Sequence, residues 1–185
     1  MRRLMFVVLV LAACGRPDAS VPPAGDSTSA VADSSSGAGG WRLTESGIGP
    51  VRVGMTVAEA AAALSSEITQ ADTQECAYVG LLGLPAGVSL MTERGRVVRV
   101  DVDDSSHVAT TRGARVGWTE AQVLAAYPGA RVEPHKYEED GHYLVALPGA
   151  PADTVHRIVF ETARGVVTRF RGGVVPAVEY VEGCS

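Results

Sequence analysis

The feature that most constrains the fold of this 185-residue chain is an internal repeat. Residues 51–60 (VRVGMTVAEA) align with residues 114–123 (ARVGWTEAQV), and further along residues 88–100 align with residues 158–170. Self-similarity of this kind indicates that one structural unit occurs twice. Because the matched segments come in the same order in both copies, each unit should contain the same elements in the same succession.

The first segment of each copy carries a signal for the start of a helix. Gly-Met-Thr-x-x-Glu at residues 54–59 and Gly-Trp-Thr-x-x-Gln at residues 117–122 both contain a capping box. In a capping box the Thr hydroxyl accepts the N3 amide, and the Glu or Gln side chain returns to the N-cap amide. The pattern predicts short helices over residues 57–65 and 120–127.

The second segment of each copy predicts a β-hairpin. Each hairpin should turn at Arg-Gly, at residues 94–95 and 164–165, because Gly adopts positive φ without steric cost. In the first copy, valines at positions 98, 100 and 102 alternate with Arg99 and Asp101. This alternation predicts a strand with one buried face and one solvated face.

A third hairpin is predicted between residues 132–138 and 142–147, with Asp140-Gly141 at its tip. Each unit then consists of a short helix followed by antiparallel strands, the first over residues 41–110 and the second, with the C-terminal tail, over residues 111–185. Units of about 70 residues bury too little apolar surface to be stable alone, so the two sheets should pack or join. The residues therefore predict an α+β fold of two tandem helix-plus-hairpin repeats.

The helix-start motifs also carry a family resemblance. Gly54-Met55-Thr56-x-x-Glu59 and Gly117-Trp118-Thr119-x-x-Gln122-Val123 resemble the signature of small envelope lipoproteins of the SmpA/OmlA (BamE) type. Two tandem copies are more similar in layout to the β-lactamase-inhibitory protein. That resemblance implies one curved antiparallel sheet with the helices on its convex side. The tail over residues 176–184 resembles the ending of uncharacterised bacterial lipoproteins.

The N-terminus resembles the export signal of bacterial lipoproteins. Two arginines precede an apolar run over residues 4–11, which is too short to cross a bilayer because a spanning helix needs about 20 apolar residues. The run leads into Leu-Ala-Ala-Cys, the form of a lipobox, which ends at Cys14. The resemblance implies a signal peptide over residues 1–13 and a lipidated Cys14 that anchors the mature protein to a membrane outside the cytoplasm.

A tether should separate this anchor from the folded part. Residues 14–40 contain no aromatic residue and no Leu, Ile or Met, so they cannot bury enough apolar surface to offset chain entropy and are predicted to be disordered. In the enteric sorting scheme an Asp after the lipidated Cys retains a lipoprotein at the inner membrane. The Gly15 found there favours the outer membrane and a location in the cell envelope.

The charge balance argues against polyanionic partners. Removal of residues 1–13 leaves 14 Lys and Arg against 21 Asp and Glu, a formal charge of −7. A chain this acidic is a poor ligand for nucleic acid or for anionic lipid headgroups.

Cys76 and Cys184 remain once Cys14 is lipidated, and an exported protein favours their oxidation to a disulfide. The bridge would close a loop of about 110 residues and contribute about 4–5 kcal/mol on the chain-entropy model. A nucleophilic role for either Cys is the alternative, but neither lies in a local sequence typical of catalytic cysteines.

Catalytic and metal-binding patterns are weak in this sequence. The segment over residues 101–107 (DVDDSSH) offers several carboxylates, yet it has neither the Gly nor the distant Glu of an EF-hand, so it is interpreted as a solvated turn. The four histidines show no zinc-binding spacing, and no nucleophile elbow is found. The sequence therefore predicts no catalytic residue, no metal and no cofactor.

These observations leave two classes of function, with a third beside them. The first is a non-enzymatic binding protein that holds an envelope protein, and it is favoured because the repeated positions serve capping, turns and packing. The second is a small hydrolase with a site split between the repeats, since paired carboxylates can lie far apart in sequence. The third is a structural lipoprotein that acts as a cell-wall spacer.

Overall fold

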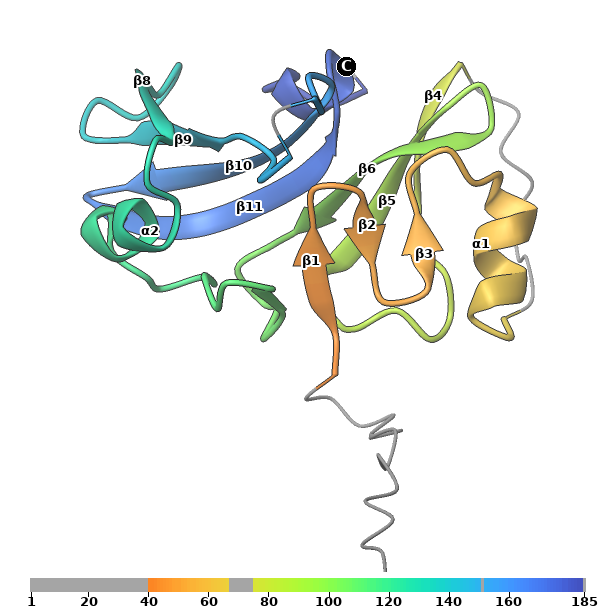
Figure 1. The fold of residues 1–185 in the computed structure, drawn as a ribbon. Coiled ribbons are helices and arrows are strands. Elements are labelled where there is room, and N and C mark those ends of the chain that lie inside the picture. Colours follow the sequence, from red (N-terminus) through yellow and green to blue (C-terminus); the bar gives the residue numbers. More distant parts are fainter. Residues whose placement is uncertain (1–39, 67–74, 151, 185) are drawn as a thin grey trace, which may run out of the picture. The chain divides into compact units, whose positions relative to one another are not determined.

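The computed structural model describes residues 40–66, 75–150 and 152–184. The predicted signal peptide, Cys14 and nearly all of the predicted tether lie outside the described residues. Two short α-helices, one 3₁₀ helix and eleven strands make up the described part (Figure 1). The helices are α1 (Val57–Ala63), α2 (Glu120–Ala126) and η1 (Ala177–Glu179). The strands are β1 (Arg42–Thr44), β2 (Gly47–Ile48), β3 (Val51–Arg52), β4 (Cys76–Val79), β5 (Val88–Glu93), β6 (Arg96–Val102), β7 (Ala109–Thr110), β8 (Arg131–Pro134), β9 (His142–Ala146), β10 (His156–Ala163) and β11 (Val166–Val174).

Seven strands form one antiparallel sheet in the order β4-β5-β6-β11-β10-β9-β8. Strands β4 to β6 come from the first repeat and β8 to β11 from the second. The halves join where β6 pairs with β11, through Phe170 opposite Val102 and Gly172 opposite Val100. The strands of the two repeats therefore join in one hydrogen-bonded sheet, which is one of the two arrangements expected from the sequence. The fold is mostly β with an α+β character.

The two Arg-Gly hairpins form as predicted. Both turn residues have positive φ in each copy, 50° and 72° at residues 94 and 95 and 50° and 73° at residues 164 and 165. This is the signature of a type I′ turn, whose twist matches that of the flanking strands.

The predicted alternation along β6 is wrong at its start. A β-bulge between Met91 and Thr92 shifts the register, so Val97 faces the core while Val98 is only half-buried. A bulge places two residues opposite one on the partner strand and so reverses the facing of the residues beyond it. The second repeat has its bulge at the matching place, between Glu161 and Thr162.

The capping boxes are both present. Thr56 accepts the Glu59 amide and Thr119 accepts the Gln122 amide, while each N3 side chain returns to its N-cap amide. Both helices are shorter than predicted: α1 ends at Ala63 and not at residue 65, and α2 ends at Ala126 and not at residue 127. Both N-termini are attached to their own hairpin by matching backbone hydrogen bonds, from Gly54 N to Val97 O at 2.7 Å and from Gly117 N to Val167 O at 2.9 Å.

A second, four-stranded sheet was not predicted from the sequence. Its order is β3-β2-β1-β7, and β1 and β7 run parallel although β1 begins the first repeat and β7 lies at its end. The small sheet packs closely over the large one at Gly172, where a Cβ atom would lie 2.5 Å from the Thr44 carbonyl oxygen. A glycine is needed at this position in β11 because any side chain would displace β1.

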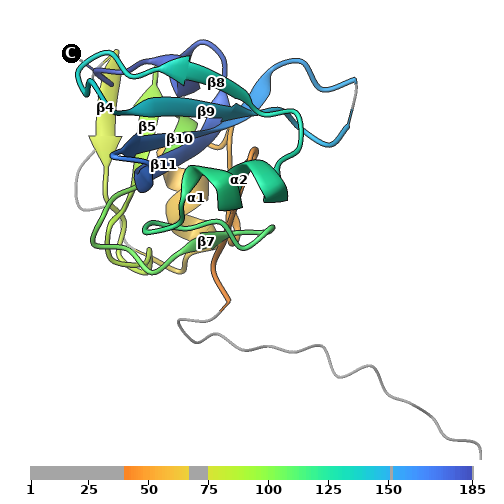
Figure 2. The ribbon, with the colours of Figure 1, turned by 90° about the vertical axis from the view of Figure 1, so that its left-hand side faces the viewer.

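The main core lies between the large sheet and the elements on one of its faces. Both helices and the small sheet contribute buried residues to one cluster, centred on Phe160 and Phe170, whose rings lie 5.6 Å apart. Figure 2 shows α1 and α2 on the same side of the strands. A smaller cluster of Tyr143, Val145, Val159 and Val178 lies on the opposite face. Adjacent residues of a strand point to opposite faces, so residues 158 and 160 join the main core while Val159 joins the smaller one.

The third hairpin forms, but its tip differs from the prediction. Strands β8 and β9 are joined by residues 135–141, and the His135 amide donates to the Gly141 carbonyl at 3.0 Å. Gly141 lies at the end of this seven-residue loop and is buried, and a Cβ there would lie 2.5 Å from the Thr162 carbonyl oxygen. Asp140-Gly141 is therefore a point of close packing instead of a two-residue turn.

Candidate functional site

The face of the large sheet that lies away from the helices is partly covered by the C-terminal segment. We call residues 175–184 the strap, and the sheet surface beneath them the strap face. Val178 is fully buried there, and Val175 and Val181 pack around it against side chains of β9 and β10. The strap therefore has its own small apolar contact with the sheet.

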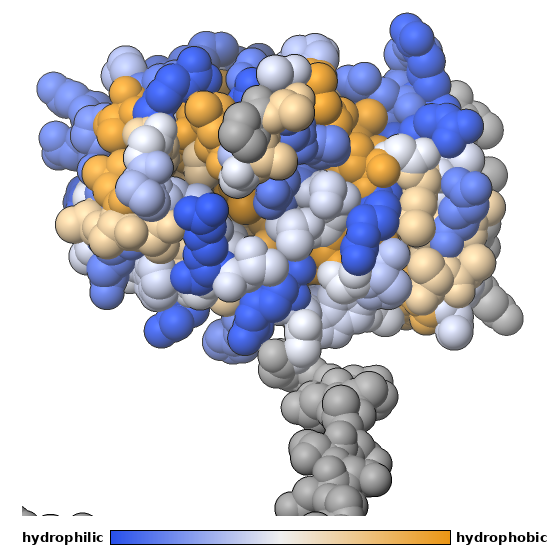
Figure 3. Space-filling view, viewed as in Figure 1, coloured by the Kyte–Doolittle hydropathy of each residue, from blue (hydrophilic) through white to orange (hydrophobic). Residues whose placement is uncertain are grey.

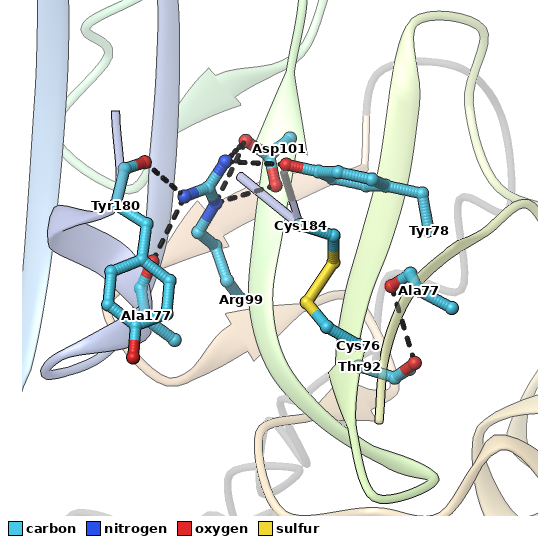
Figure 4. The surroundings of a disulfide bond; sticks show 9 residues. All are labelled: Cys76, Ala77, Tyr78, Thr92, Arg99, Asp101, Ala177, Tyr180 and Cys184. Atoms are coloured by element: carbon cyan, nitrogen blue, oxygen red, sulfur yellow. Dashed lines mark hydrogen bonds and ion pairs between the residues drawn. A yellow bond between two sulfur atoms is a disulfide. The ribbon is translucent and has the colours of Figure 1, made fainter. Parts of the chain in front are cut away.

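A buried arginine fastens the strap to the sheet (Figure 4). The Arg99 Nη1 donates to the carbonyl oxygens of Ala177 at 3.0 Å and Tyr180 at 2.8 Å. Its Nε and Nη2 donate to the Asp101 carboxylate, and Nη2 also donates to the Tyr78 hydroxyl at 2.8 Å. The Arg99 side chain is only 4% exposed. The prediction of a solvated face for Arg99 and Asp101 is therefore wrong, because the strap removes this face from water and supplies the acceptors that a buried guanidinium needs.

A second buried arginine repeats this arrangement on β11. The Arg171 Nε donates to the Val178 carbonyl at 2.6 Å, and its Nη1 forms an ion pair with Glu161. The Glu161 carboxylate also lies 3.6 Å from Arg169 Nε and 3.7 Å from His135 Nε2. Since each buried charge has an opposite charge or a carbonyl dipole beside it, the network meets the condition for burying ionic groups.

A disulfide holds the end of the strap. Cys76 in β4 and Cys184 are bonded, with their Cα atoms 5.4 Å apart and a separation of 108 positions in sequence. The structure thus contains the bridge predicted from the cysteine count. The bridge joins the last residues of the second repeat to the edge strand of the first.

The β8–β9 loop clamps the strap from the other side. Lys136 Nζ lies 2.7 Å from the Glu182 carboxylate, and the Tyr137 hydroxyl donates to the same carboxylate. The hydrogen bond to Lys136, followed by the one to Tyr137, lowers the pKa of Glu182. The clamp lies at the surface, so its contribution to stability is small.

A groove remains between the strap and strands β8 to β11. It consists of two adjoining cavities of about 380 Å³ and about 350 Å³ that share Val181. Together we call them the strap groove, and its lining residues are Arg131, Glu133, Pro134, Lys136, Tyr143, Val145, Val159, Arg171, Glu179, Tyr180, Val181, Glu182 and Gly183. Val145, Val159 and the buried Arg171 lie at the base of the groove, and charged side chains such as Arg131 and Glu179 line it as well, so it combines apolar and polar groups as binding sites do.

Tyrosines are concentrated around this groove. Of the five in the chain, Tyr78, Tyr137, Tyr143 and Tyr180 contact the strap or the strap face, and only Tyr127 lies in the main core. Tyr137 is 61% exposed, Tyr78 47% and Tyr180 38%. Exposed tyrosines are enriched at protein interfaces because the ring supplies contact area and the hydroxyl supplies a hydrogen bond. In the view of Figure 3, by contrast, the apolar surface is divided into patches by polar and charged side chains.

The remaining candidates from the sequence are not brought together. Asp103 Oδ1 accepts the Ser105 amide at 2.9 Å and its hydroxyl at 2.6 Å, which makes the segment after β6 a side-chain-capped turn. His142 pairs with Glu120 and His156 with Asp153, each at 2.8 Å. In the part of the chain that the structure describes, no three His, Cys, Asp or Glu side chains are grouped as metal ligands.

Sequence reasoning missed Arg99 and Arg171 as the residues that organise the strap face. An arginine between valines on a strand usually points to solvent, so the local pattern predicted an exposed Arg99. The sequence indicated burial of this face only indirectly, through the pairing of the cysteines. A bridge between Cys76 and Cys184 forces the tail back over the first repeat, where it must cover some of the polar face.

Comparison of the chain with protein-family models, with curated proteins and with solved structures found no match. Among the described residues, no helix has the length and apolar character needed to span a bilayer.

Proposed function

We propose that this protein is a lipid-anchored lipoprotein of the cell envelope that acts as a non-enzymatic binding module. Its fold is two tandem helix-plus-hairpin repeats that build one curved sheet with the helices on one side. Cys14 carries the lipid, residues 15–40 act as a tether, and the strap groove contacts a partner protein of the envelope. The observation that carries this proposal is the strap groove itself, a preformed concave site lined in part by Tyr143 and the exposed Tyr180.

The tandem-repeat architecture is supported by equivalent contacts in the two halves. The capping boxes, the type I′ turns, the bulges and the hydrogen bonds from Gly54 and Gly117 to the hairpins all occur at matching positions. Contacts of this kind depend on backbone geometry, so a duplicated unit accounts for them more simply than two unrelated ones.

The extracytoplasmic location is supported by two independent features. The N-terminal sequence has the order of a lipoprotein signal, and the structure has a disulfide that joins distant parts of the chain. Structural disulfides persist in oxidising compartments and are rare in the cytosol.

The binding role is supported by the rigidity of the groove. Two buried arginines hold the middle of the strap, and the disulfide and the Lys136–Glu182 pair hold its C-terminal end. A preorganised surface loses little conformational entropy when a partner binds, which raises affinity.

Affinity capture from envelope extracts, with the whole protein as bait, tests the binding role. Tyr180→Ser and Val181→Asp change side chains that line the groove, whereas Leu82→Ser changes a residue that is 70% exposed and lies outside it. One partner should be recovered with the wild type and with Leu82→Ser and lost with both groove variants. Equal recovery with all four proteins would contradict the proposed site.

The anchor has a separate test. Cys14→Ser removes the sulfur at the lipidation position, so the variant should move from the membrane fraction to the soluble fraction and should not incorporate labelled palmitate. Incorporation that persists in the variant would contradict the assignment of Cys14.

A further inference from the structure

A smaller cavity of about 160 Å³ lies on the helix side of the large sheet, on the face opposite the strap groove. It is formed where the β1–β2 turn, the end of α2 and the start of the β9–β10 loop meet. The lining residues that matter here are Glu45, Arg112, Tyr127, Ala146, Leu147 and Ile158. By the measure of about 15 Å³ for each water, the cavity has room for on the order of ten non-hydrogen atoms.

Two opposite charges line this cavity without neutralising each other. Among the described residues, neither Glu45 nor the free Nη2 edge of Arg112 has a side-chain partner. Arg112 is held in place by its Nη1, which donates to the Ala126 carbonyl at 2.9 Å, and by the Tyr127 ring, whose centroid lies 4.8 Å from its guanidinium carbon. The cavity therefore presents a fixed cation, the Arg112 guanidinium, and a separate anion, the Glu45 carboxylate.

The third polar group is the buried Tyr127 hydroxyl, which makes no well-formed hydrogen bond within the described part of the chain. Burial raises the pKa of Tyr127, and its nearest side-chain polar neighbour is the Thr110 hydroxyl, which opposes that rise. Tyr127 is only 6% exposed, and its neighbour Thr110 already accepts the Ala114 amide at 3.1 Å. Native proteins seldom leave a buried hydroxyl unsatisfied, so each such group requires an explanation such as a bound water or ligand.

The wall opposite these polar groups is apolar. Ala146, Leu147 and Ile158 supply aliphatic surface beside the charged and hydroxyl groups. A small ligand with a cationic end, an anionic end and an aliphatic part would satisfy all of the lining groups at once. Such a ligand meets Glu45 with its cation, and Arg112 and Tyr127 with its anion.

We propose that this cavity binds a small zwitterion of the α-amino-acid class with an aliphatic side chain. The ammonium group binds Glu45, the carboxylate binds Arg112 and accepts the Tyr127 hydroxyl, and the side chain packs on Leu147 and Ile158. The site is independent of the strap groove, so it does not rest on the proposed envelope partner.

Titration calorimetry of the whole protein against L-alanine, L-valine and L-leucine tests this site. At least one of the three should bind, whereas N-acetyl-L-leucine and L-leucinamide, which each lack one charge, should bind about tenfold or more weakly than L-leucine. L-leucine should also raise the melting temperature in proportion to the logarithm of its concentration above Kd.

Matched variants assign each end of the ligand. Glu45→Gln should abolish the preference for L-leucine over its N-acetyl form, and Arg112→Gln should abolish the preference over the amide. Tyr127→Phe should weaken L-leucine binding with little loss of stability, because the hydroxyl it removes makes no well-formed hydrogen bond in the described part of the fold. Asp104→Asn changes an exposed charge outside the cavity and serves as the control.

Three results would overturn the proposal. One is the absence of binding by all three amino acids. Another is binding that Glu45→Gln, Arg112→Gln and Tyr127→Phe leave unchanged. The third is a crystal structure grown with L-leucine in which only water fills the cavity.

Discussion

At the scale of single residues, the strap face shows how one side chain can connect distant segments. Arg99 donates to a carboxylate on its own strand, to a phenol on β4 and to two carbonyls of the strap. The planar guanidinium directs its donors to these acceptors in fixed directions, so a lysine would not replace it.

Replacing Arg99 with Met should therefore be costly. The change leaves the half-buried Asp101 and two strap carbonyls without their donor, and we expect a loss of about 3 kcal/mol in the free energy of unfolding. Arg169→Met is the matched control, because residue 169 holds the equivalent repeat position and its side chain is 66% exposed. The control should lose less than about 1 kcal/mol in urea unfolding. If Arg99→Met lost no more stability than Arg169→Met, the strap would not depend on Arg99.

At the scale of elements, the two helices are equivalent in their N-terminal caps. Replacing Thr56 or Thr119 with Ala should cost about 1 kcal/mol each, since both remove an N-cap oxygen that accepts an N3 amide. Thermal unfolding of the two variants, with Asp104→Ala as a surface control, measures the loss. A cap substitution that cost no more than the control would argue against the capping boxes as stabilising contacts.

The chemistry of the N3 residue makes only the first cap sensitive to acid. The backbone hydrogen bond from Thr56, and then the one from its hydroxyl, lowers the pKa of Glu59 below its ordinary value of 4.5. A lowered pKa in the folded state gives stability that is present above 4.5 and is lost as pH falls through the folded pKa. The stability advantage of the wild type over Glu59→Gln should therefore shrink between about pH 6 and about pH 3. Gln122 in the second cap does not titrate, and Gln122→Ala should lose the same stability at both pH values.

Elements that depend on nearby residues could be predicted from the sequence. Capping boxes and type I′ turns are decided within a few positions, and both helices and both Arg-Gly hairpins form where the sequence predicts them. The small sheet was missed because β1 and β7 are far apart in sequence and each is only two or three residues long. The bulges were missed for a related reason, since the partner strand sets the register.

The candidate site was harder to predict than the fold. The Cys76–Cys184 pairing could be inferred by counting cysteines, but the burial of Arg99 and the strap groove depend on where the C-terminal segment folds back. Nothing local to Arg99 distinguishes a buried guanidinium from an exposed one. The acceptors that allow its burial, Ala177 and Tyr180, lie about eighty residues away.

At the scale of the whole molecule, the disulfide links the two repeats through the strap. Cys76→Ala and Cys184→Ala should lower the melting temperature by a similar amount, and the double variant should add little because both changes remove one interaction. The chain-entropy model gives a loss of about 4–5 kcal/mol. Labelling of both thiols in the native exported protein would contradict the bridge.

The central claim is that the strap groove is the surface that contacts an envelope partner. Photo-crosslinking amino acids placed at the groove positions 133, 180 and 181 in living cells test it, with positions 58 and 62 on the exposed side of α1 as controls. The groove positions should give one discrete adduct of the same added mass, and the α1 positions should give none. Adducts that form from α1 and not from the groove would contradict the claim.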